Sequence, residues 1–141
     1  MAISMTRREA REQAFCLLFE QALGGEDMEE IILSAAQARD LVPNSFAESL
    51  AYGVEENQEK IDRVITENIQ GWSLSRLSKV ALTLLRLAIY EMLFDSSIPS
   101  SVSINEAVEL GKTYGGEGDP SYINGVLGSV MKAHCPQEEK S

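Results

Sequence analysis

The chain has few of the residues from which most catalytic and metal sites are built. It contains one histidine, His134, and two cysteines, Cys16 and Cys135, which stand near opposite ends of its 141 residues. Neither cysteine belongs to a Cys-x-x-Cys pair or to a Cys/His spacing that suits zinc. No serine or cysteine is placed beside the histidine by the sequence. We therefore expect no enzyme, no metal and no cofactor, and free thiols of the kind found in cytosolic proteins.

Long hydrophobic runs are missing as well. No apolar stretch reaches the roughly 20 residues that span a membrane, and charged side chains interrupt residues 1–23, unlike a signal peptide. The sequence therefore predicts a cytoplasmic protein. A chain of this length that is 44% hydrophobic and 24% charged is expected to form one globular domain. We place it at residues 1–135, followed by a polar tail at residues 136–141.

Basic residues are scarce compared with acidic ones. Twelve lysines and arginines stand against 22 aspartates and glutamates, so the net charge is −10. This balance argues against general, sequence-independent binding of nucleic acid, which depends on neutralising many phosphates. A local basic patch still permits RNA binding, and the overall charge suits a basic protein partner.

Helical periodicity runs through almost the whole chain, with no convincing alternating strand, and it predicts an all-α bundle. Helix starts are expected at three capping boxes with the pattern Ser/Thr-x-x-Glu: Thr6 with Glu9, Ser45 (after Pro43 and Asn44) with Glu48, and Ser103 with Glu106. Further helices are expected over residues 27–38 and around an apolar stripe: Ile61, Val64, Ile65 and Ile69.

The strongest helical pattern runs from Leu77 to Leu93. Apolar residues recur there at i, i+3, i+4 and i+7, and further leucines widen the apolar arc. A helix that is apolar over most of its circumference is contacted on several sides. We therefore expect this segment to be the central helix of the bundle.

Glycines and a proline are expected to shape the last connection. Gly115, Gly116 and Gly118 are predicted to end the preceding helix through left-handed backbone conformations. Asp119 then offers an N-cap and Pro120 a first helical residue. Tyr122 falls in the first turn of this last helix. Two interpretations of it stay open: its ring stacks on an RNA base, or it packs at the edge of the core.

A quarter of all basic residues lie in the first helix, as Arg7, Arg8 and Arg11. Helical spacing aligns the last two with Phe15 and Phe19. Arginine suits phosphate because its planar fork donates two parallel hydrogen bonds. Cations at a helix N-terminus oppose the helix dipole, so their presence weakly favours a function. A solvated surface without a ligand is the alternative, and residue type and spacing alone favour it.

Three blocks of sequence, taken together, resemble one family. They are Arg7-Arg8-Glu9-Ala10-Arg11-Glu12-Gln13-Ala14 followed by Phe19, then residues 84–92 (LLRLAIYEM), and finally residues 102–112 (VSINEAVELGK) followed by residues 122–127 (YINGVL). In this order and spacing they resemble the bacterial transcription antitermination factor NusB, over nearly the whole chain. The same fold occurs in some ribosomal-RNA methyltransferases, but this chain has no methyltransferase domain.

The resemblance implies about seven helices, packed as two small bundles around a long central helix. It also implies a non-enzymatic role: binding boxA-type single-stranded RNA together with a small-subunit ribosomal protein, NusE. Other Nus factors and RNA polymerase join indirectly. Such a complex suppresses termination and supports ribosomal-RNA synthesis.

The resemblance also implies site residues. The expected RNA-binding set is Arg7, Arg8, Arg11, Phe19, Ser121, Tyr122 and Asn124, and the expected partner-binding set is Ala81, Leu82, Arg86 and Tyr90.

The chain departs from the family pattern at three places. Phe19 stands where many members carry tyrosine. Ala81 and Leu82 replace a frequent acid-base pair, and Ser121 replaces a lysine of some members. The change at Phe19 removes any hydrogen bond from the tyrosine hydroxyl, and the change at Ala81 and Leu82 bears on contacts with the ribosomal partner. Ser121 and the net charge of −10 predict weaker RNA binding by the chain alone, with much of the affinity supplied by the basic partner. The alternative function is a protein-protein scaffold or homodimer with little RNA affinity.

Overall fold

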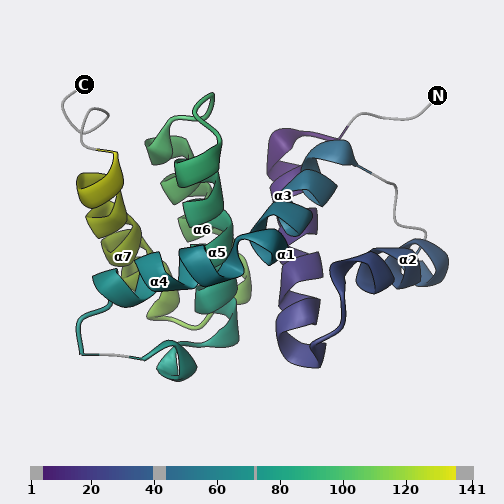
Figure 1. Cartoon of the computed structure of the whole chain (residues 1–141), viewed down its shortest axis with the longest axis horizontal. Coiled ribbons are helices and arrows are strands. Elements are labelled where there is room, and N and C mark those ends of the chain that lie inside the picture. Colours follow the sequence, from purple (N-terminus) through teal and green to yellow (C-terminus); the bar gives the residue numbers. More distant parts are fainter. Residues whose placement is uncertain (1–4, 40–43, 72, 136–141) are drawn as a thin grey trace.

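The computed structural model describes residues 5–39, 44–71 and 73–135, and it folds them into seven α-helices and one 3-10 turn without a strand (Figure 1). In chain order they are α1 (Arg7–Gly24), α2 (Met28–Arg39), α3 (Ser45–Glu56), α4 (Gln58–Asn68), η1 (Leu74–Arg76), α5 (Lys79–Phe94), α6 (Ser100–Tyr114) and α7 (Asp119–His134). The all-α prediction is confirmed. Pro43 and the predicted tail at residues 136–141 lie outside the described residues. None of the described helices is both long and apolar enough to cross a bilayer.

Helix α5 lies between two groups of helices. Helices α1, α2 and α3 pack together on one side, and α4, α6 and α7 gather on the other (Figure 1). Helix α5 contacts α1 and α3 of the first group and all three helices of the second. Its residues Leu84, Leu85 and Ile89 are fully buried. The predicted central helix is therefore confirmed, and it begins at Lys79, two residues after the predicted start.

The first predicted capping box is confirmed. The Thr6 hydroxyl accepts a hydrogen bond from the backbone N–H of Glu9 (3.1 Å), and the Glu9 carboxylate accepts one from the backbone N–H of Thr6 (3.0 Å). These hydrogen bonds lower the pKa of Glu9, because they stabilise its charged form. Gly25 ends the helix with φ +75°, a left-handed conformation that suits glycine.

The other two predicted capping boxes are wrong. Asn44 caps α3, because its side-chain oxygen accepts the backbone N–H of Ala47 (2.9 Å), and Ser45 is already helical. Helix α6 begins at Ser100, so Ser103 and Glu106 lie inside it. Their side chains are therefore free to contact other helices, and both do so.

The predicted role of the glycines before α7 is also wrong. Gly115 and Gly118 have φ values of −95° and −86°, so neither is left-handed. Gly115 is instead required by space, because a Cβ there would lie 2.7 Å from the Asp119 carboxylate. That carboxylate accepts the backbone N–H of Gly116 (3.0 Å). Asp119 is the first helical residue, with Gly118 at the N-cap position, so Pro120 falls one place later than predicted.

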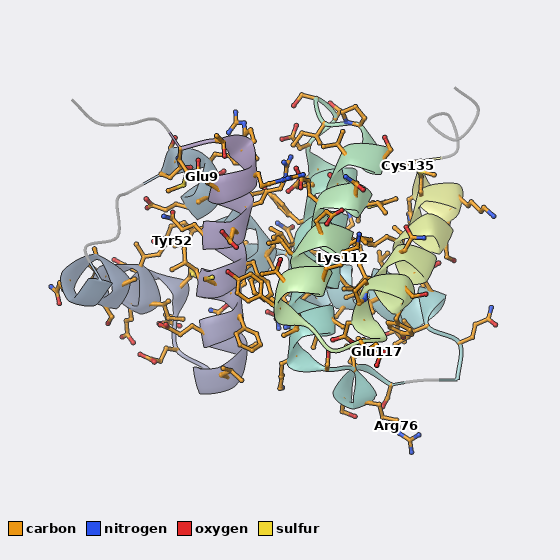
Figure 2. All side chains as sticks on the ribbon, turned by 180° about the vertical axis from the view of Figure 1, so that it is seen from behind. Glu9, Tyr52, Arg76, Lys112, Glu117 and Cys135 are labelled. Carbon is orange, nitrogen blue, oxygen red and sulfur yellow. The ribbon has the colours of Figure 1, made fainter. Side chains whose placement is uncertain are left out.

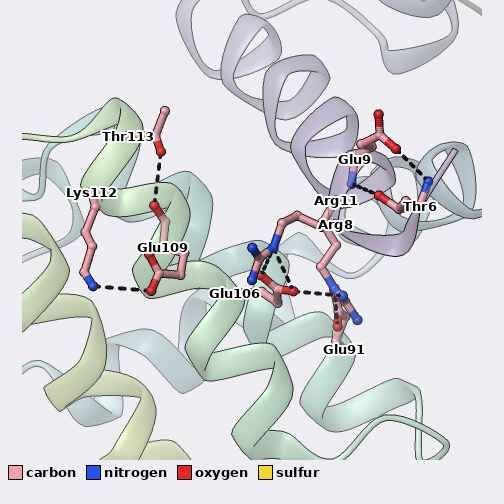
Figure 3. Close-up of polar contacts among 9 residues, drawn as sticks. All are labelled: Thr6, Arg8, Glu9, Arg11, Glu91, Glu106, Glu109, Lys112 and Thr113. Carbon is pink, nitrogen blue, oxygen red and sulfur yellow. Dashed lines mark hydrogen bonds and ion pairs between the residues drawn. The ribbon is translucent and has the colours of Figure 1, made fainter.

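A buried ion pair joins α1 to α5, and a serine of α6 donates to the same carboxylate (Figure 3). The Arg11 Nε on α1 lies 2.9 and 3.1 Å from the two carboxylate oxygens of Glu91 on α5, and Ser103 on α6 donates a hydrogen bond to the same carboxylate (2.8 Å). The Arg11 side chain is 7% exposed and that of Glu91 is 1% exposed. Arg8 pairs nearby with Glu106 (3.0 Å) but remains 67% exposed. Three helices therefore meet at one desolvated carboxylate.

We predict that Arg11→Met destabilises the fold by about 3–5 kcal/mol, because it leaves the Glu91 charge buried without its cation. Urea unfolding followed by circular dichroism measures this cost. Arg8→Met is the matched control and should cost at most about 1 kcal/mol, since its ion pair is exposed. The double variant Arg11→Met/Glu91→Leu should regain most of the loss. Equal costs for the two single variants would contradict a stabilising role for the buried pair.

Close packing between α3 and α5 yields a second prediction. A Cβ at Gly53 would lie 2.2 Å from the Tyr90 ring, so Gly53→Ala forces this ring out of its place between the helices and should cost about 1–3 kcal/mol. Gly128→Ala in α7 is the matched control, because its Cβ would meet no atom within 4 Å. It should stabilise the fold by about 0.4–1 kcal/mol. Thermal unfolding of both variants tests these opposite effects. A stabilised Gly53→Ala protein would refute the close contact between Gly53 and Tyr90.

Candidate RNA and partner surfaces

The first turn of α1 presents two of the three predicted arginines to solvent. Arg7 is exposed, and its guanidinium carbon lies 3.8 Å from the centre of the Phe46 ring on α3. Arg8 is exposed as well, and its ion pair with Glu106 holds the side chain over α6. Both guanidinium groups are therefore positioned by the protein and still accessible to a phosphate.

Arg11 is placed differently. Its guanidinium is buried against Glu91 and lies 4.0 Å from Glu106. A phosphate could reach it only by breaking the buried pair that joins α1 to α5. We therefore assign Arg11 to the fold and leave it out of the surface proposed below. The helical spacing that placed it beside Arg8 could not show which of the two faced the interior.

Phe19 belongs to an aromatic cluster between α1 and α6. It is half-buried and stacks on the buried Phe15 ring (5.6 Å between centroids), which in turn contacts Tyr114 (4.9 Å). The Tyr114 hydroxyl donates a hydrogen bond to Glu12 (2.8 Å), and this bond together with burial raises the pKa of Tyr114. Tyr114 is 41% exposed and extends the cluster to the surface. The sequence analysis did not single it out.

Tyr122 lines a small open pocket. The pocket has a volume of about 220 Å³ and lies where η1, α5 and α7 meet, bounded by Arg76, Leu77, Ser78, Ala81, Asp119 and Tyr122. Tyr122 is half-buried against the core, and its hydroxyl is buried without a hydrogen-bond partner among the described residues. Burial raises the pKa of that hydroxyl. The side chain thus packs at the core edge, as one interpretation held, and it also forms a pocket wall.

Ser121 and Asn124 flank Tyr122 on the same helix, and both are exposed. They are close to Tyr122 along the chain, but neither side chain lines the pocket.

The first turn of α1, which carries Arg7 and Arg8 and is called the arginine turn from here on, lies far from the Tyr122 pocket. In Figure 2, Glu9 marks the first turn of α1 at one end of the molecule, and Glu117, just before α7, lies near the other end. Helix α5 spans this separation, with Ser78 at the pocket and Glu91 against Arg11, a rise of about 20 Å over 13 residues. An RNA strand that touches both places must therefore run along the molecule.

The predicted partner residues divide among three places. Ala81 is buried and lines the Tyr122 pocket, whereas Leu82 is buried and lines a groove on the other flank of α5. Arg86 lines the same groove and forms a two-bond ion pair with Asp62 on α4 (2.8 and 2.9 Å). Tyr90 packs over α3 and stacks on a ring one turn later, so its main contacts are internal.

The groove has a volume of about 390 Å³ and combines apolar walls with charges of both signs. Helix α5 supplies Lys79, Leu82 and Arg86, which share one face at i, i+3 and i+7. The turn between α1 and α2 supplies the acidic pair Glu26–Asp27. The acidic pair was not predicted to take part, since local sequence could not show that this turn would face α5.

The described residues contain no cluster of histidine, cysteine, aspartate and glutamate that could hold a metal ion. His134 is the exposed last residue of α7, and Cys16 and Cys135 form no disulfide.

Comparison with known proteins shows which family the chain resembles. Residues 8–132 match the model of the NusB family. The transcription antitermination protein NusB of Clostridium novyi is 41% identical over 133 residues, covering 92% of this chain and all of that protein. The protein of the same name from Acetivibrio thermocellus is 46% identical, covering 91% of this chain and 90% of that protein.

Solved structures agree with the sequence comparison. The T. maritima NusB structure superposes with a TM-score of 0.84 at 35% identity and covers 97% of this chain and 98% of its own. A structure of the antitermination factors NusB and NusE in complex with dsRNA matches with a TM-score of 0.82 at 28% identity, covering 91% and 97%. The chain, from its arginine-bearing first helix to its last, belongs to the NusB family.

Proposed function

We propose that this chain is an RNA-binding adaptor in transcription antitermination. It acts by binding rather than by catalysis, together with the ribosomal protein NusE, on boxA-type single-stranded RNA. Other Nus factors and RNA polymerase join the complex indirectly. The observation that carries the proposal is the match, over 91% of this chain, to a NusB that was solved with NusE and RNA.

The RNA surface of the proposal has two parts. Arg7 and Arg8 take backbone phosphates at one end of α1, where both side chains are exposed. At the other end of the molecule, Tyr122 receives a base in its pocket, with Ser121 and Asn124 beside it. Phe19 offers an apolar contact between these parts through its half-buried ring. Two arginines are few for an RNA surface, so we propose weak binding by the chain alone.

The partner surface of the proposal is the groove beside α5. A net charge of −10 attracts a basic protein, and the groove offers both carboxylates, at Glu26 and Asp27, and an apolar floor that includes Leu82. The first turns of α5 then separate the partner groove from the RNA pocket, because Lys79 and Leu82 line the groove while Ser78 and Ala81 line the pocket. A partner seated there lies next to the RNA and can add phosphate contacts.

Fluorescence anisotropy of a labelled boxA-type RNA tests the proposal. The chain alone should bind weakly, and addition of NusE should tighten binding severalfold in a salt-dependent way. If the RNA is bound neither by the chain nor by the mixture, the adaptor function is wrong. Sedimentation of the chain alone at micromolar concentration then tests the remaining candidate, a homodimeric scaffold.

We predict that Arg7→Ala and Arg8→Ala each weaken RNA binding and reduce the slope of log affinity against log salt by about 0.7, the value for one lost phosphate contact on a single strand. Titrations at four salt concentrations measure the slope. Arg63→Ala on α4 is the matched control, since it removes an exposed arginine outside the proposed surface. Unchanged slopes for Arg7 and Arg8 would remove the arginine turn from the RNA surface.

We predict that Glu26→Lys slows association with NusE by about tenfold at low salt, because charges at an interface rim act mainly on the association rate. The effect should shrink as salt is added. Stopped-flow fluorescence measures the rate. Glu67→Lys on α4 makes the same change of charge at an exposed site outside the groove. If both variants slow association equally, only the net charge matters and the groove is not the contact surface.

A further inference from the structure

Two helices begin beside the pocket at Tyr122. Helix α5 begins at Lys79 and α7 at Asp119, and both starts border the pocket. Helix N-termini ordinarily favour an anion such as phosphate. Here the Asp119 carboxylate already lines the pocket. A phosphate would meet this negative charge, so the pocket suits a group that donates hydrogen bonds.

The Asp119 carboxylate is held in place through one of its two oxygens. Its Oδ2 accepts a hydrogen bond from the Ser78 hydroxyl (3.1 Å) and one from the backbone N–H of Gly116 (3.0 Å). The Ser78 hydroxyl is itself fixed, because it accepts the backbone N–H of Ala81 (3.0 Å). Within the described part of the chain, the second oxygen, Oδ1, has no hydrogen-bond partner. The pocket therefore contains a positioned acceptor that retains unused capacity.

The other walls suit a flat ring. Tyr122, Leu77 and Ala81 supply aromatic and apolar surface, and the exposed Arg76 stands at the edge. The volume of about 220 Å³ is below the range of roughly 300–1,000 Å³ typical of sites for drug-sized ligands. A single unstacked nucleobase fits this description, with its sugar and phosphate outside the pocket and near Arg76.

Resting on the RNA-binding function proposed above, we propose that this pocket selects guanine. The Watson–Crick edge of guanine presents two adjacent donors, N1–H and N2–H₂, which the two lone pairs of Oδ1 can accept together while Oδ2 keeps its bonds to Ser78 and Gly116. Uracil has one donor between two carbonyl oxygens that a carboxylate repels. In cytosine and adenine the amino group stands beside a ring nitrogen that is itself an acceptor.

The test begins with the RNA. Each guanine of a boxA-type RNA is replaced in turn by inosine, which lacks only the N2 amino group, and binding to the complex of this chain with NusE is measured by anisotropy. We expect one position where inosine weakens binding by at least about fivefold, since a two-bond base contact is worth roughly 1–3 kcal/mol. Adenine at that position should bind more weakly still.

Variants of the chain then test whether the Asp119 carboxylate causes the preference for guanine over inosine. Asp119→Asn should bind the guanine and inosine RNAs equally well, because its amide oxygen has to accept the Gly116 N–H, which leaves the NH₂ group, a donor, facing the base. Glu117→Gln is the matched control, since it neutralises an exposed acid in the same loop that does not line the pocket, and it should retain the preference. The inosine series on the unaltered chain remains informative even if Asp119→Asn folds poorly.

The outcomes separate this inference from the function on which it rests. RNA that binds with no guanine position sensitive to inosine, or a preference that survives Asp119→Asn, overturns guanine selection and leaves the adaptor function standing. Absence of RNA binding by the complex overturns both.

Discussion

The buried carboxylate of Glu91 is the point on which the arrangement of the helices depends. It receives Arg11 from α1 and Ser103 from α6, so the helix that carries the exposed arginines is fixed to the core of the other group. Burying charge is costly, and a hydrophobic pair of the same size often gives equal or greater stability. The ion pair instead fixes the orientation of α1 about its own axis. Only one rotation of α1 brings Arg11 to Glu91, and that rotation leaves Arg7 and Arg8 exposed to solvent.

Helix α5 turns this fixed arrangement into a basis for function. It is apolar nearly all round and contacts both groups of helices, so its position is set from several sides. Its first two turns reach the surface between the Tyr122 pocket and the acidic groove. Under the proposed function, RNA and partner occupy the two flanks of one rigid helix. Each ligand then finds its site already formed, which lowers the entropy lost on binding.

The sequence was most informative where a pattern repeats. The stripe of α5 predicted a central helix, and the Thr6–Glu9 box predicted the start of α1; both are confirmed. The sequence was misleading where the side chains of a local motif contact other helices instead of their own backbone. Ser103 and Glu106 have the spacing of a capping box, yet they lie inside α6 and bind Glu91, Arg8 and Arg11. Arg11 and Arg8 are one turn apart, and only the packing of α1 on α5 decides which of them is buried. The pocket wall at Asp119 likewise depends on η1, α5 and α7 meeting in space.

Amide hydrogen exchange, measured on the free chain, with RNA, and with RNA and NusE together, tests most directly whether both ligands meet at the start of α5. RNA should protect residues 76–82 and 119–124, and NusE should extend protection to the turn between α1 and α2 and to the groove-facing part of α5. The described helices outside these surfaces, α4 above all, should exchange as in the free chain. Protection centred on α4 and the end of α5, with the Tyr122 pocket unaffected, would contradict this account.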